Sequence, residues 1–118
     1  MTHAIKWLDD VEEHDFPAAL SYLTLHFNEE IAASLVDRLR AAPVVHFAAK
    51  DILRASGLRP LDASNRHVKH NIEKAHDGKP LSPVLLVRHD RLLISDGFHR
   101  VCGVHLIDED ALIPAKIV

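Results

Sequence analysis

The fold is decided by the stretch Leu92-Leu93-Ile94-Ser95-Asp96-Gly97-Phe98-His99-Arg100-Val101-Cys102-Gly103-Val104, where an apolar run meets a Ser-Asp-Gly turn and a His-Arg pair. The apolar residues predict a buried strand, and the residues from Phe98 onward predict a helix. A strand that turns directly into a helix aims the first backbone N–H groups of the helix, and the positive end of its dipole, at one spot. We therefore expect an anion site here, and phosphate is the anion that fits it best.

The polar side chains of this turn differ in their chemistry. Arg100 offers a planar, bidentate donor and His99 a titratable one. Asp96 is expected to cap the helix, and its functional alternative is a carboxylate that holds Mg²⁺ or acts as a general base. The alternative for Arg100 is a structural ion pair with an acidic neighbour such as Asp108 or Glu109. Catalytic roles stay unassigned, with Asp96, His99 and Arg100 as the candidates.

Length and composition favour one ordinary α+β domain. The chain has 118 residues, of which 47% are hydrophobic, and a net charge of −3, which gives no support to nucleic-acid binding. The single cysteine, Cys102, excludes an intramolecular disulfide and fits a reducing compartment. No apolar run approaches the roughly 20 residues that span a bilayer, and the N-terminus lacks the pattern of a signal peptide. We therefore expect a cytoplasmic protein without a membrane segment.

Hydrophobic periodicity and breaker residues predict the element order α-α-β-α-α-β-β-α-β. A polar lead-in of about 14 residues comes first, docked through Trp7 and Leu8. The predicted helices cover about 15–26, 28–41, 50–56, 65–75 and 98–107, and the predicted strands cover about 44–47, 84–87, 92–94 and 113–118. This order predicts a small mixed sheet with packed helices, preceded by a helical hairpin.

The helical hairpin is defined by two predicted N-caps and an apolar stripe. Asp15 is expected to cap the first helix and Asn28 the second. Ile31, Leu35 and Leu39 recur at helical spacing and predict the buried stripe of the second helix. The apolar residues of the hairpin either belong to the core or form a surface for a second copy or a partner protein.

Residues 43–118 resemble the ParB/sulfiredoxin fold family in the order of their elements. The matching features are a short strand and helical turn, a capped helix, a Gly/Pro-containing loop that leads into an apolar strand, and a second strand that runs into Gly97-Phe98-His99-Arg100. The closing Ile-Pro-Ala-Lys-Ile-Val at 113–118 is similar to the terminal strand of sulfiredoxins. The resemblance implies a single domain over 1–118, with 1–42 as a helical extension and 43–118 as the core.

The resemblance also implies a nucleotide pocket. Sulfiredoxins hold ATP phosphates at a Gly-Cys-His-Arg helix start, and ParB partition proteins hold CTP at a related Gly-x-Arg-Arg segment. By this resemblance His99 and Arg100 contact phosphates, and Gly97 allows close approach of the backbone. His67 and Asn71 are the matching positions on the preceding helix, where they share a face, although their residue types differ from those of sulfiredoxins. The implied ligand is ATP or CTP with Mg²⁺, or another phosphate.

The resemblance does not extend to the reaction of sulfiredoxins. Phe98 stands where those proteins have their nucleophilic cysteine, and Cys102 lies one helical turn farther on. Reduction of a sulfinic acid is therefore not expected, and we expect Cys102 and Gly103 to pack their helix against the sheet. His67 and His70 have no acidic or cysteine partner nearby in the sequence, so no metal site is assigned.

Three functions follow from these observations. The first is a nucleotide- or phosphate-binding domain, with hydrolysis of the nucleotide as an extension. The second is a non-enzymatic regulatory or protein-interaction module whose pocket is vestigial. The third is a ParB-like, metal-dependent nuclease, which the net charge and the lack of clustered acidic residues disfavour.

Overall fold

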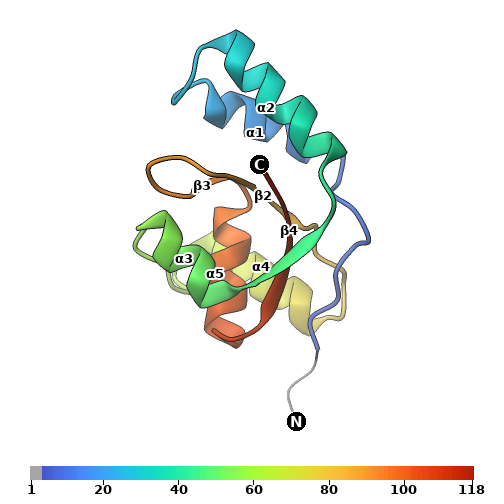
Figure 1. Ribbon diagram of the computed structural model, residues 1–118. Helices are drawn as coiled ribbons and strands as arrows, with labels where there is room; N and C mark the ends of the chain where they lie inside the picture. Colours follow the sequence, from blue (N-terminus) through green and yellow to red (C-terminus); the bar gives the residue numbers. More distant parts are fainter. Residues whose placement is uncertain (1–3) are drawn as a thin grey trace.

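The computed structural model describes residues 4–118, and its order of elements is the one predicted from the sequence. The fold is α+β (Figure 1). The helices are α1 (Asp15–Leu23), α2 (Glu29–Ala41), α3 (Ala49–Ser56), α4 (Arg66–His76) and α5 (Phe98–Ile107). The strands are β1 (Val45–Ala48), β2 (Val84–Val87), β3 (Leu93–Asp96) and β4 (Leu112–Ile117). Within residues 4–118, no helix combines the length and the apolar character needed to cross a lipid bilayer.

The four strands form one mixed sheet in the order β1-β4-β2-β3. Only the central pair, β2 and β4, is parallel, and the two outer pairs are antiparallel. The register between β2 and β3 shifts beside Leu85, which pairs with Asp96, whereas Leu86 pairs with Ile94. The extra residue, Ser95, turns its hydroxyl back to donate to the Leu85 carbonyl oxygen at 3.0 Å. This irregularity ends β3 at Asp96, immediately before α5 begins.

Helices cover both faces of the sheet. Successive residues of a strand point to opposite faces, so β2 contributes Leu85 to one side and Leu86 to the other. The Leu85 side packs against α1 and α2, and the Leu86 side packs against α3, α4 and α5. Figure 1 shows these two helix layers above and below the sheet. The apolar stripe of the helical hairpin therefore belongs to the core.

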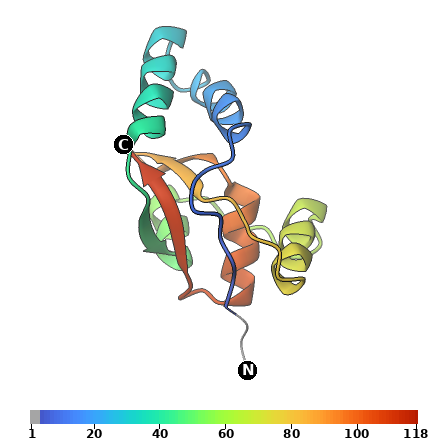
Figure 2. The ribbon, with the colours of Figure 1, turned by 90° about the vertical axis from the view of Figure 1, so that its right-hand side faces the viewer.

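The lead-in docks as predicted. Trp7 pairs with Leu81 in a parallel bridge, and the backbone N–H of Leu8 donates to the Leu81 carbonyl oxygen at 2.8 Å. Figure 2 shows this lead-in, in blue, beside the segment that enters β2. Of the predicted lead-in, residues 1–3 lie outside the described residues, and the part that follows is thereby fixed against the rest of the fold.

Two details of the helical hairpin differ from the prediction. The buried stripe of α2 is Ala32, Val36 and Leu39, whereas Ile31 is 46% exposed. The small side chain of Ala32 lets α1 and α2 approach closely. The sequence prediction placed Ile31 on the buried face because Ile31 is the more hydrophobic of the two residues. In addition, α1 ends at Leu23 rather than near residue 26, because the chain must reach the extended N-cap conformation of Asn28 within a short loop.

The predicted N-caps have different outcomes. Asn28 caps α2, because its side chain accepts a hydrogen bond from the Ile31 N–H at 2.9 Å. Asn65 caps α4 in the same way, through the N–H groups of His67 and Val68. The prediction for Asp15 is wrong: it lies inside the first turn of α1, and its side chain is buried and bonded elsewhere in the fold.

Gly103 allows α4 and α5 to pack closely, whereas the sequence predicted close packing of α5 against the sheet. A Cβ atom at this position would lie 3.3 Å from Asn71 Cβ and 3.4 Å from the Val68 carbonyl oxygen. Both distances are tight for a methyl group, and the second involves backbone that cannot move aside easily. The contact matters for the site because α4 carries His67 and α5 carries His99.

We expect Gly103→Val to lower the free energy of unfolding by about 2 kcal/mol, because the added methyl groups would force α4 and α5 apart. Urea denaturation measures this loss. Leu106→Val is the control, since Leu106 lies on the same helix and is 48% exposed. Equal midpoints for Gly103→Val and the parent protein would contradict the close packing described here.

Candidate functional site

The residues predicted to form the site come together. A hollow of about 190 Å³ lies at the N-terminus of α5. Its lining consists of His67, Asn71, Asp96, Gly97, Phe98, His99 and Arg100. Every side chain singled out from the sequence as catalytic or ligand-binding therefore lines this one hollow.

Gly97, not Asp96, is the N-cap of α5. Its φ of 105° is left-handed, and a Cβ atom there would lie 2.6 Å from Val84 Cγ1, so the turn requires glycine. No side chain of residues 4–118 caps the helix. The cap prediction for Asp96 is wrong because the left-handed turn leaves Asp96 at the end of β3. The first N–H groups of α5 therefore remain available to a ligand.

Arg100 is held in an ionic network beneath the hollow. Its Nη2 atom lies 3.5 Å from Asp15 Oδ2 and 3.7 Å from Asp96 Oδ2, and its Nη1 donates to the Pro83 carbonyl oxygen at 3.5 Å. The Arg100 side chain is only 16% exposed. It is therefore a fixed charge in the floor of the site, with some of its donor capacity already used.

The predicted structural partners of Arg100 were the wrong ones. Asp108 and Glu109 follow the last residue of α5, whereas Arg100 lies in its first turn. A ten-residue helix separates its two ends by about 15 Å. The ion pair exists, but its carboxylates come from β3 and from α1.

Asp15 is the site residue that sequence reasoning missed. It is 5% exposed, and its Oδ2 atom accepts a hydrogen bond from Ser82 Oγ at 2.7 Å. Ser82 Oγ in turn accepts from the Glu12 N–H at 3.1 Å, which ties the start of α1 to the segment before β2. An aspartate at a helix start is normally interpreted as a cap, and nothing local in the sequence indicates a contact with Arg100.

Asp96 has an unusual environment for a carboxyl group. Burial, followed by the nearby negative charge of Asp15, raises the pKa of Asp96 from its ordinary value of 3.8 to about 6. The positive charge of Arg100 opposes this rise but is outweighed. Within the described residues, Asp96 Oδ2 is buried without a hydrogen-bond partner. Asp96 can therefore exchange a proton near neutral pH, as a general acid or base must.

Two histidines from different helices face each other in the hollow. The ring centroids of His67 on α4 and His99 on α5 lie 5.0 Å apart. Burial, and then the neighbouring His67, lowers the pKa of His99, so this ring is neutral at physiological pH and carries one N–H donor. Asn71 donates one side-chain N–H to the His67 carbonyl oxygen at 2.8 Å, which leaves its second N–H as a donor and its amide oxygen as an acceptor for a ligand.

Cys102 takes no part in the hollow. It is fully buried, and its Sγ atom accepts a weak hydrogen bond from the Leu61 N–H at 3.5 Å. Burial raises the pKa of the Cys102 thiol, which disfavours the reactive thiolate. As predicted, Cys102 acts as a small packing group. Phe98 lines the hollow instead, with its ring centroid 5.6 Å from that of His99.

Few side chains in the hollow are suited to bind a metal ion. Residues 4–118 contain no group of three or more His, Cys, Asp or Glu side chains placed to hold a metal. Asp96 is the carboxylate among the lining residues. A divalent cation bound there would need oxygen ligands from water and from the phosphate itself, which is a common arrangement for Mg²⁺.

Comparisons of the chain with protein-family models, with curated proteins and with solved structures found no match. The resemblance to the ParB/sulfiredoxin fold family therefore stays a prediction.

We expect the difference in the free energy of unfolding between Asp96→Asn and the parent to change with pH, in favour of the variant as the pH rises. A raised pKa means that the folded state holds the proton more tightly than the unfolded state, so the parent loses stability as the pH rises from about 4 to about 6. The asparagine variant does not undergo this loss. Between pH 4 and pH 8 its free energy of unfolding should gain about 2 kcal/mol on the parent, allowing for partial solvent screening.

Urea denaturation at several pH values measures this difference. Asp90→Asn, on the exposed turn between β2 and β3, controls for the removal of one negative charge elsewhere. A difference between Asp96→Asn and the parent that does not change with pH would show that Asp96 titrates normally.

Proposed function

We propose that this chain binds a phosphate-bearing ligand, a nucleotide such as ATP or CTP, at the N-terminus of α5. The observation that carries the proposal is an uncapped helix start that opens into a hollow shared with His67 and His99. Backbone N–H groups and the positive end of the helix dipole favour phosphate at such a place. The resemblance of Gly97-Phe98-His99-Arg100 to the phosphate-binding segment of sulfiredoxins supports the same assignment.

The ionisation state of Asp96 controls how well the site accepts an anion. With Asp96 ionised, its negative charge adds to that of Asp15 near the helix terminus, which opposes a phosphate. Arg100 offsets part of this negative charge, and His14 Nε2 lies 3.3 Å from Asp15 Oδ1. With Asp96 protonated, Asp15 and Arg100 offset each other and the positive helix terminus dominates. A Mg²⁺ ion between Asp96 and the phosphate would have the same effect, and its chemistry suits one carboxylate plus phosphate oxygens. Binding should therefore need Mg²⁺ at pH 7.5 and depend on it less at pH 5.5.

The same groups could support hydrolysis of the bound nucleotide. The helix N-terminus and Arg100 would stabilise negative charge on the phosphoryl group as water attacks it. Asp96, when ionised and not bound to a metal, is suited to accept the proton of that water. The neutral His99 would keep its N–H proton and donate a hydrogen bond to the leaving oxygen. Bound Mg²⁺ would supply further neutralisation of the phosphate charge.

Arg100→Ala is not a clean test of binding. The sequence alone suggests that this variant would keep its fold, but Arg100 is the cation that compensates the buried Asp15. Removing one partner of such a pair costs roughly 3–5 kcal/mol. His99 is a better position, because its side chain lines the hollow without joining the ionic network.

We expect ATP, CTP or GTP with Mg²⁺ to raise the melting temperature of the parent protein, and His99→Ala to weaken the binding about tenfold through the loss of a polar contact to phosphate. Thermal shift and isothermal titration calorimetry measure both effects, with inorganic phosphate as the minimal ligand. His70→Ala is the matched control, because His70 is exposed on α4 outside the hollow.

Two outcomes would contradict the proposal. One is the absence of a melting shift with every nucleotide and with phosphate, with and without Mg²⁺. The other is equal affinity in the parent and in His99→Ala, together with a change in His70→Ala. The first outcome would favour the non-enzymatic interaction module over a phosphate-binding protein, and the second would show that the ligand binds outside this hollow.

A further inference from the structure

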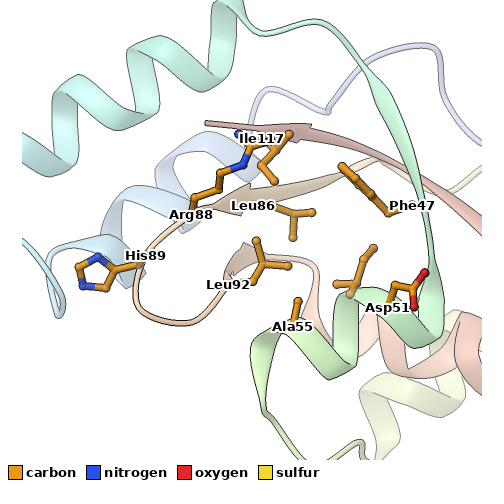
Figure 3. Close-up of a pocket in the computed structure, with 9 residues that line it drawn as sticks. Phe47, Asp51, Ala55, Leu86, Arg88, His89, Leu92 and Ile117 are labelled. Atoms are coloured by element: carbon orange, nitrogen blue, oxygen red, sulfur yellow. The ribbon is translucent and has the colours of Figure 1, made fainter.

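A second and larger hollow lies at the opposite end of the β2–β3 hairpin. Its volume is about 460 Å³, within the usual range of about 300–1,000 Å³ for small-molecule sites. β2 and β3 meet α5 at Leu85 and Asp96, whereas this hollow is reached from Leu86, Arg88 and Leu92 at the turn between the two strands. Figure 3 shows it between α3 and the ends of β2 and β4.

We propose that this hollow binds a small molecule with an apolar body and a single carboxylate, that is, an aliphatic or aromatic acid. The walls are apolar and come from four elements of the fold. They include Phe47, Ile52, Leu86, Leu92 and Ile117. Figure 3 shows Phe47 reaching in from one side and Leu92 and Ala55 from below. Such walls suit an apolar body, and they offer few partners to a strongly polar one.

The positive charge of Arg88 indicates that the ligand is an anion. Its side chain lies at the rim, beside Ile117 in Figure 3, and no ion pair involves it within residues 4–118. Asp51 also lines the hollow, but Arg54 Nη2 lies 3.1 Å from its Oδ1 atom and neutralises it. The uncompensated charge at the rim is therefore positive. A guanidinium is well suited to bind a carboxylate bidentately.

His89 is excluded as a ligand-binding group despite its place in the lining. Its ring packs against Phe27, with ring centroids 4.8 Å apart, and Figure 3 shows it turned away from the other side chains of the hollow. Arg88 is therefore the polar group on which recognition depends.

Backbone hydrogen bonds hold the elements around the hollow in place. The Leu92 N–H donates to the Ala55 carbonyl oxygen at 3.0 Å, which fixes α3 against the hairpin. The Arg88 N–H donates to the Val118 carbonyl oxygen at 2.7 Å, which fixes the end of β2 against the segment after β4. A preformed hollow reduces the ordering cost of binding. The small side chain of Ala55 leaves the space that a ligand would occupy.

The test is an NMR titration of the ¹⁵N-labelled protein with 3-phenylpropionate and octanoate, and with 3-phenylpropanol and octanol as uncharged counterparts. We expect the acids to shift the backbone amides of Phe47, Leu86, Arg88 and Leu92. They should bind about tenfold more tightly than the alcohols, because each acid adds a charge-assisted hydrogen bond to the shared apolar contacts.

Substitutions at Arg88 and Ala55 test separately how the charge at the rim and the shape of the hollow contribute to ligand binding. Arg88→Gln should remove the advantage of the acids over the alcohols, whereas Arg91→Gln, which removes an exposed cation of the same turn outside the lining, should keep it. Ala55→Leu should weaken binding of both acids and alcohols, because the longer side chain takes up part of the hollow. Ala55 is exposed on a helix, so this substitution is compatible with folding.

The proposal fails if neither acid shifts these amides, if acids and alcohols bind equally, or if Arg88→Gln and Arg91→Gln behave alike. Its outcome is independent of the phosphate site. His99→Ala should bind the acids as the parent does, and acids that compete with ATP for one site would overturn the assignment of two hollows.

Discussion

The site depends on one buried interaction, the contact of the Arg100 guanidinium with Asp15 and Asp96. Asp15 comes from α1, Asp96 from the end of β3 and Arg100 from the first turn of α5. This network joins the helical hairpin to the sheet and to the helix whose N-terminus faces the hollow. Because a buried charge without a partner is costly, the three elements must take up one relative arrangement. The hairpin is therefore part of the candidate site and not a separate attachment.

The same network sets the electrostatics of the hollow. Burial first, and then the negative charge of Asp15, raise the pKa of Asp96 to about 6, although the nearby Arg100 and His14 oppose this rise. Asp96 thereby changes its charge within the physiological range, while its Oδ2 atom has no hydrogen-bond partner among the described residues. A helix terminus that attracts anions thus lies beside a carboxyl group whose ionisation regulates the binding of those anions. The proposed phosphate binding and its dependence on Mg²⁺ both derive from this pairing.

Local patterns in the sequence predicted most of the fold and the part of the hollow at the start of α5, whereas His67 and Asn71 were assigned to the hollow through the resemblance to sulfiredoxins. Breaker residues and apolar runs define the order of the elements, and the strand–turn–helix stretch brings Asp96, Gly97, His99 and Arg100 together whatever the rest of the chain does. The role of Asp15 could not be predicted, because a cap and a long-range ion pair require the same residue at the same helix start. Likewise, the left-handed turn at Gly97, which displaces Asp96 from the cap, depends on the close approach of Val84 from the neighbouring strand.

The most direct test of this account is the pKa of Asp96 itself, measured by ¹³C NMR of its carboxyl group in the parent and in Asp15→Asn. The asparagine keeps an acceptor for Ser82 and removes the negative charge beside Asp96. The account predicts a pKa of about 6 in the parent and a distinctly lower pKa in the variant, since Asp15 contributes to the rise. An ordinary pKa in the parent, or an equal pKa in both proteins, would contradict it.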